Sequence, residues 1–134
     1  MSSILAAVGT EQLRKLDSMN NSRRDHAADY ANQLQNIEGI ECPIEPPGYK
    51  HVYQMFTIKL DSNFYQRNEC VEYLRSVGIG ASVHFDPPVH KHPIYQEFVD
   101  SSLPVTEKVS DEILTLPMFP SLKKREIFDA QMKK

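Results

Sequence analysis

The densest group of side chains that could do chemistry lies in residues 82–92, which hold three of the five histidines. Imidazole and carboxylate groups bind zinc, but the spacing of His84, His90 and His92 matches no compact zinc pattern. His84 and Asp86 are two residues apart, so on a strand both would face one ligand as an acid/base pair. A third interpretation is a proline-stiffened loop that presents the imidazoles for binding. Each histidine alone is more often structural, but together they favour a site.

Gln54 is a second candidate because it is the only polar residue on an otherwise apolar strand face. That face also holds Val52, Phe56, Ile58 and Leu60. A buried polar side chain needs a hydrogen-bond partner. Gln54 therefore either meets water at the edge of the sheet or points into a cleft beside His84 on a neighbouring strand.

Motifs for phosphate-bearing cofactors and for common hydrolases are missing. The sequence has no GxGxxG, P-loop, GxSxG, HExxH or CxxC motif, and only five glycines. A complete enzyme with a phosphorylated cofactor is expected to carry a glycine-bearing phosphate cradle. The sequence therefore argues against a complete enzyme of this kind within these 134 residues.

Composition indicates one soluble globular domain. The chain has 15 basic and 18 acidic residues and a net charge of −3, which argues against a general nucleic-acid binder. No apolar run approaches the ~20 residues that span a bilayer, and the N-terminus lacks the basic stretch of a signal peptide. Cys42 and Cys70 are expected to be reduced thiols, so we expect a cytoplasmic protein without membrane contact.

Apolar residues at helical spacing predict a long helix over residues 1–38. We expect it to be capped by Ser2 or Ser3, bent or broken near Asn20, and ended by Gly39. Its first turns, residues 4–8, are apolar nearly all round. This pattern suits burial against a surface that the chain does not contain.

The rest of the chain is expected to form a sheet-and-helix core over residues 51–134, after a proline-rich loop at 41–50. Alternating patterns predict three strands, over residues 51–60, 80–86 and 113–118. Helical patterns predict helices over residues 63–78, 92–98 and 104–112, with a last helix capped by Ser121. Strands separated by helices indicate an α/β (α+β) fold, a small three-stranded sheet with helices packed on it.

Five motifs occur in a fixed order along almost the whole chain. They are MSSILAAVGTEQLRKLD at 1–17, HVYQMF at 51–56, LRSVGI at 74–79, VHFDPPVHKHPIY at 83–95 and ILTLPMFP at 113–120. Together they resemble the C-terminal region of the DegT/DnrJ/StrS-type aminotransferases. These enzymes use pyridoxal phosphate (PLP) to aminate keto-sugar nucleotides, with glutamate as the usual amino donor.

The resemblance implies the small domain of a fold-type-I aminotransferase, with the PLP-binding large domain absent. The Schiff-base lysine and most cofactor contacts lie in that large domain. This chain is therefore expected to hold no catalytic, cofactor-binding or metal-binding residue and to be inactive alone. The intact enzyme is expected to be a cytoplasmic homodimer that serves polysaccharide or related sugar biosynthesis. The substrate-binding residues implied in this chain are His84, Phe85, Asp86, His90 and Gln54.

Several positions depart from the family pattern. Phe85 stands where tyrosine is usual, which removes a hydroxyl, and Asp86 separates His84 and Phe85 from the family's proline. Gln54 stands where histidine or another polar residue is common. Two other classes of function stay open: a stand-alone module that binds a sugar nucleotide or a protein, and a metal hydrolase built on the histidines.

Overall fold

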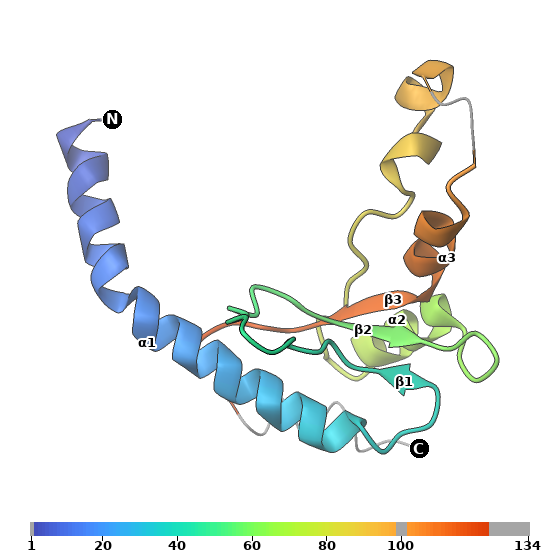
Figure 1. Cartoon of the computed structure of the whole chain (residues 1–134), viewed down its shortest axis with the longest axis horizontal. Helices are drawn as coiled ribbons and strands as arrows, with labels where there is room; N and C mark the ends of the chain where they lie inside the picture. Colours follow the sequence, from blue (N-terminus) through green and yellow to red (C-terminus); the bar gives the residue numbers. More distant parts are fainter. Residues whose placement is uncertain (1, 99–101, 124–134) are drawn as a thin grey trace.

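The computed structural model describes residues 2–98 and 102–123. It begins with α1, Ser3–Leu34, whose N-cap Ser2 accepts a hydrogen bond from the Leu5 backbone N–H at 3.4 Å. The helix is continuous through Asn20, where a break was one expectation, and it bends along its length (Figure 1). It ends four residues before the predicted end at 38. Figure 1 shows its first half projecting away from the rest of the molecule and its second half beside the sheet.

The sheet has three antiparallel strands in the order β1-β2-β3. These strands are β1, Ile40–Glu41, β2, Phe56–Leu60, and β3, Ile113–Leu116. In the register, Ile40 lies opposite Leu60, and Phe56 lies opposite Leu116. Helices α2, Arg67–Ser76, and α3, Pro104–Glu112, lie between β2 and β3 in the chain. The expected mixed fold with a three-stranded sheet is confirmed.

The core forms where the second half of α1 meets the sheet. Tyr30 and Phe56 are almost fully buried, and their rings stack with centroids 5.0 Å apart. The Tyr30 hydroxyl donates to the Pro117 carbonyl at 3.0 Å, which satisfies a polar group that burial would otherwise penalise. Leu114 of β3 is also buried. These contacts fix the end of the chain segment that carries α3 and β3.

Two of the predicted strands differ from the structure. The strand expected at 51–60 begins only at Phe56, because Tyr53 has φ +46° and a bend covers residues 54–55. The strand expected at 80–86 is reduced to one bridge between Ser82 and Thr115. Phe85 has φ +64°, a left-handed conformation that no strand continues through. The third strand is β1, at the edge of the loop that we predicted over residues 41–50.

The helix expected at 63–78 was also placed too early. The Asn63 backbone N–H donates to Asp61 Oδ1 at 2.9 Å in a turn, and α2 starts after Gln66. Two short 3₁₀ helices follow, η1, Val89–Lys91, and η2, Pro93–Phe98, the second of which matches the expected turn at 92–98. Helix α3 has the predicted bounds, with Pro104 at its start. The last helix expected after Ser121 lies outside the described residues.

Candidate functional site

A cavity of about 680 Å³ opens beside the histidine-rich segment, between the 84–90 stretch, η2 and α3. It is mainly apolar. Three of the five expected site residues, His84, Phe85 and His90, line it together with Tyr95 and Phe98. Asp86 and Gln54 are not among its lining residues.

His90 is held at this cavity by an acidic residue of α3. Its Nε2 lies 3.2 Å from Glu107 Oε1, and its side chain is only 11% exposed. Lys91 Nζ lies 2.7 Å from the other oxygen of Glu107. Hydrogen bonds from Lys91, His90 and the Leu103 N–H lower the pKa of Glu107 to about 2. The carboxylate is therefore ionised across the physiological range.

Asp86 does not line the cavity, and its carboxylate contacts the first residue of α2. Arg67 Nη2 donates to Asp86 Oδ2 at 2.7 Å, and the Arg67 side chain is only 8% exposed. On the other side of the loop, Ser110 Oγ donates to the Phe85 carbonyl at 3.4 Å. The expected substrate ligand Asp86 is thus engaged in anchoring the loop that carries His84 and Phe85. Arg67 was missed as a site residue, although an arginine on the apolar stripe of a helix was a visible signal.

His84 and Gln54 are both exposed, but in different places. His84 Nε2 lies 3.2 Å from Ser82 Oγ, and its ring is 6.4 Å from that of Phe85. Gln54 lies in the bend before β2 and is exposed. Because β3 pairs with β2 and Ser82 pairs with β3, the His84 segment is not a neighbour of β2. Of the two interpretations of Gln54, the exposed position agrees with contact with water, and the cleft beside His84 on an adjacent strand is not formed.

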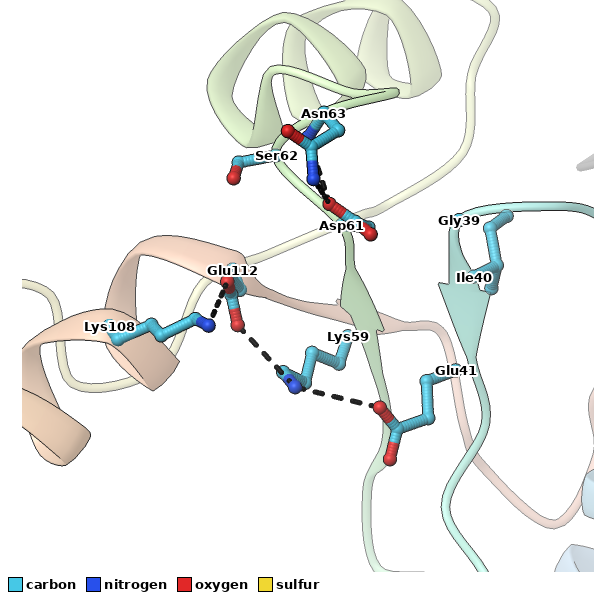
Figure 2. A pocket seen from close by; sticks show the side chains of 9 residues that line it. All are labelled: Gly39, Ile40, Glu41, Lys59, Asp61, Ser62, Asn63, Lys108 and Glu112. Carbon is cyan, nitrogen blue, oxygen red and sulfur yellow. Dashed lines mark hydrogen bonds and ion pairs between the residues drawn. The ribbon is translucent and has the colours of Figure 1, made fainter.

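A second cavity of about 340 Å³ is polar and lies over β1, β2 and the end of α3 (Figure 2). Figure 2 shows Lys59 between two carboxylates, with Nζ 3.5 Å from Glu41 and 3.6 Å from Glu112. Lys108 approaches the same Glu112 at 3.8 Å. Glu41 first, and then Glu112, raise the pKa of Lys59. Both lysines that line this cavity are thus paired with carboxylates.

The described residues do not fit PLP. A Schiff-base lysine needs an amine whose pKa is lowered by burial or by nearby cations. The lysines that line a described cavity, Lys59 and Lys108, are paired with carboxylates, and the pKa of Lys59 is raised. Among residues 2–98 and 102–123, no group of three or more His, Cys, Asp or Glu side chains could hold a metal ion. No described helix is long and apolar enough to cross a membrane.

Known proteins resemble this chain over nearly its full length. Residues 1–130 match the profile of the DegT/DnrJ/EryC1/StrS aminotransferase family. A pleiotropic regulatory protein of Geobacillus stearothermophilus is 33% identical over 90% of this chain and 32% of its own length. The dTDP-3-amino-3,4,6-trideoxy-alpha-D-glucose transaminase of Streptomyces venezuelae is 33% identical over 89% of this chain and 31% of its own.

Solved structures give the same result. DesV of S. venezuelae, in complex with a ketimine intermediate, has a TM-score of 0.84 at 29% identity. The match covers 96% of this chain and 36% of DesV. The aminotransferase TlmJ of Streptoalloteichus hindustanus has a TM-score of 0.84 at 26% identity, over 93% of this chain and 33% of its own. This chain spans about a third of the length of these relatives. With its motifs, its fold and this profile in agreement, the chain belongs to the DegT/DnrJ/EryC1/StrS aminotransferase family, whose members depend on PLP.

Proposed function

We propose that this chain forms the small domain of an aminotransferase that acts on a keto-sugar nucleotide. An amino acid would give up its amino group and become a 2-oxo acid, while the sugar ketone becomes an amine. We expect glutamate, the usual donor in this family. PLP and its lysine would belong to a large domain outside these residues, since the two lysines that line a described cavity, Lys59 and Lys108, do not fit them. Support comes from relatives named as transaminases of dTDP-linked sugars and as a UDP-N-acetyl-3-dehydro-alpha-D-glucosamine aminotransferase.

The observation that carries this proposal is the apolar cavity lined by His84, Phe85 and His90. Ligand pockets are largely apolar with a few polar groups that fix orientation. Phe85 and Tyr95 offer ring surface to the flat or apolar parts of a sugar nucleotide, and the imidazoles offer hydrogen bonds to its polar groups. In this proposal the chain binds and orients the substrate.

Asp86 and Gln54 have weaker support as substrate contacts. The Asp86 carboxylate is paired with Arg67, so we assign it the role of holding the loop. Gln54 is exposed and lines none of the described cavities, so in this proposal it reaches only a ligand that extends between this chain and a large domain. A homodimeric enzyme and a cytoplasmic location also stay proposals. The free thiols of Cys42 and Cys70 agree with a reducing compartment.

The test compares two histidine variants of the enzyme that contains this chain. His84→Ala should raise the KM for the sugar nucleotide about tenfold, the effect of losing roughly 1.4 kcal/mol of binding. His92→Ala is the matched control, because His92 is exposed and does not line the cavity. Equal kinetics for the two variants would remove the cavity as the substrate site.

The stand-alone binding module is a second candidate, because the cavity forms entirely from the described residues of this chain. Calorimetry on the 134-residue chain with dTDP-glucose separates the two ideas. Micromolar binding that His84→Ala abolishes would favour the module. Absent binding by the chain, with binding by the assembled enzyme, would favour the small domain.

A further inference from the structure

The Glu107 carboxylate contacts hydrogen-bond donors from two separate segments, one that holds His90 and one that holds Leu103. Its Oε1 lies 3.2 Å from His90 Nε2 and accepts from Ser102 Oγ at 3.2 Å and from the Leu103 N–H at 3.1 Å. Its Oε2 pairs with Lys91 Nζ at 2.7 Å. One carboxylate of α3 therefore connects η1, which carries His90, to the segment that leads into α3.

This arrangement fixes how the His90 ring can be used. The pKa of Glu107 is lowered to about 2 by Lys91 first, then by His90 and the Leu103 N–H. An ionised carboxylate can only accept, so Nε2 of His90 must donate to it. Nδ1 is then the only polar atom left on the ring, and it has no hydrogen-bond partner among residues 2–98 and 102–123. In the neutral ring Nδ1 is an acceptor.

We propose that Glu107 is a positioning residue that holds His90 so that Nδ1 accepts an N–H or O–H group of the ligand in the apolar cavity. The inference rests on the proposed function, because it takes the ligand to be a sugar nucleotide. The bond to Nε2 sets the donor and acceptor sides of the imidazole, as second partners of functional histidines commonly do. Ring orientation is therefore set from α3, 17 residues further along the chain.

Glu107 also caps α3 through the Leu103 N–H, so a merely structural role has to be separated from positioning. Glu107→Ala removes both functions. Glu107→Gln keeps an oxygen that accepts from His90 and from Leu103, and loses only the charge that faces Lys91. Asp111→Ala is the control, since it removes an exposed acid from the same helix without touching His90.

The first measurement is the exchange of the His90 ring Nε2–H with water, followed by NMR on the full 134-residue chain. A hydrogen-bonded ring proton exchanges slowly. Wild type, Glu107→Gln and Asp111→Ala should retain a slow signal, and Glu107→Ala should lose it. A signal equally slow in Glu107→Ala would show that Glu107 does not hold the ring, which overturns the proposal.

The second measurement is a double-mutant cycle on ligand affinity in the enzyme that contains this chain. Glu107→Ala should weaken dTDP-glucose binding about fivefold when His90 is present and have no effect in His90→Ala. The same cycle with dTDP alone locates the donor: coupling that persists places it on the nucleotide, and coupling that disappears places it on the sugar.

The two proposals fail in different ways in this cycle. An equal loss from Glu107→Ala with and without His90 would make Glu107 only a structural residue and overturn the inference, leaving the cavity as the substrate site. Full affinity in His90→Ala together with full affinity in His84→Ala would remove the proposed function, and the inference would fall with it.

Discussion

The apolar cavity beside residues 84–90 and the polar cavity over β1 and β2 differ in how their charged groups are placed. In the polar cavity, Lys59 lies between Glu41 and Glu112, and each lysine that lines the cavity is paired with a carboxylate (Figure 2). In the apolar cavity, the ionised Glu107 lies behind His90, and the wall exposes rings such as Phe85, which is 75% exposed. A cavity with internally paired charges has little left to bind a ligand. In the apolar cavity, the carboxylate that holds His90 leaves the apolar surface and the second ring nitrogen available to a ligand.

The largest expected effect concerns catalysis. It tests whether the ion pairs of Lys59 and Lys108 keep these lysines from reacting with PLP. Mixed with PLP, the 134-residue chain should show no transaminase turnover and no stoichiometric labelling of one lysine after borohydride reduction. The physical reason is that Lys59 and Lys108 are paired with carboxylates. Lys59→Arg is the control and should behave like wild type. Specific labelling of Lys59 with turnover would reverse the assignment of the two cavities.

The next effect concerns the anchor of the apolar cavity. Asp86→Ala should lower the free energy of unfolding by about 1–2 kcal/mol, because it removes a hydrogen-bond partner of the buried Arg67 guanidinium while Asp86 itself is 38% exposed. Glu41→Ala is the matched change in the polar cavity. It should cost less than about 0.5 kcal/mol, because the Glu41 side chain is 75% exposed. Urea denaturation measures both, and similar losses would show that the two cavities are anchored alike.

The two cavities should also respond to opposite ends of the pH scale. The pKa of Glu107 falls from 4.5 to about 2 on folding, so its contribution to stability is present above pH 4.5 and is lost as the pH falls toward 2. The pKa of Lys59 is raised above 10.5, so its contribution is present below that pH and is lost as the pH rises through the folded value.

Variants separate these two arms. The measurement is the midpoint of unfolding as a function of pH. Glu107→Gln should reduce only the loss of stability at acid pH, and Glu41→Gln should reduce only the loss at alkaline pH. Glu45, whose pKa is also lowered to about 2 by Arg24 and by the His51 N–H, keeps part of the acid arm in both variants. A change in the same arm for both variants would contradict the electrostatic contrast.

The smallest effect concerns a separate apolar surface, on the first turns of α1. Ile4, Leu5 and Val8 are 78%, 61% and 54% exposed, so the described chain does not cover them. In a monomer, the amides of residues 2–9 should exchange quickly with solvent, and those near Tyr30 slowly. Hydrogen exchange with sedimentation at low concentration decides this. Protection of residues 2–9 in a strictly monomeric species would mean that the chain covers this surface by itself and that no partner is missing.

Local patterns predicted the parts of the fold that local forces determine. Alternation placed Phe56, Ile58 and Leu60 on one face, and all three are buried. Pro104 marked the start of α3. The two-residue strand β1 has too few residues for any pattern, and the left-handed conformation of Phe85 is unusual for a residue with a bulky side chain. Those features were therefore missed.

The candidate site was predicted in its residues but not in its connections. His84, Phe85 and His90 are close in sequence, so their grouping at one cavity followed from the segment itself. The segment is held by Arg67, 19 residues before Asp86, and by Glu107, 17 residues after His90. Only tertiary packing brings these partners together. The expected cleft with Gln54 failed for the same reason, because β3 separates the two segments.

The most direct test of the central claim is a crystal structure of the enzyme that contains this chain, with a dTDP-linked sugar bound. We expect the ligand to lie in the apolar cavity against Phe85 or Tyr95, within hydrogen-bond distance of His84 or His90. It also predicts that the pairs of Lys59 with Glu41 and Glu112 stay closed. A ligand bound among Lys59, Lys108 and Glu112, or one that touches no residue of the 84–90 segment, would contradict it.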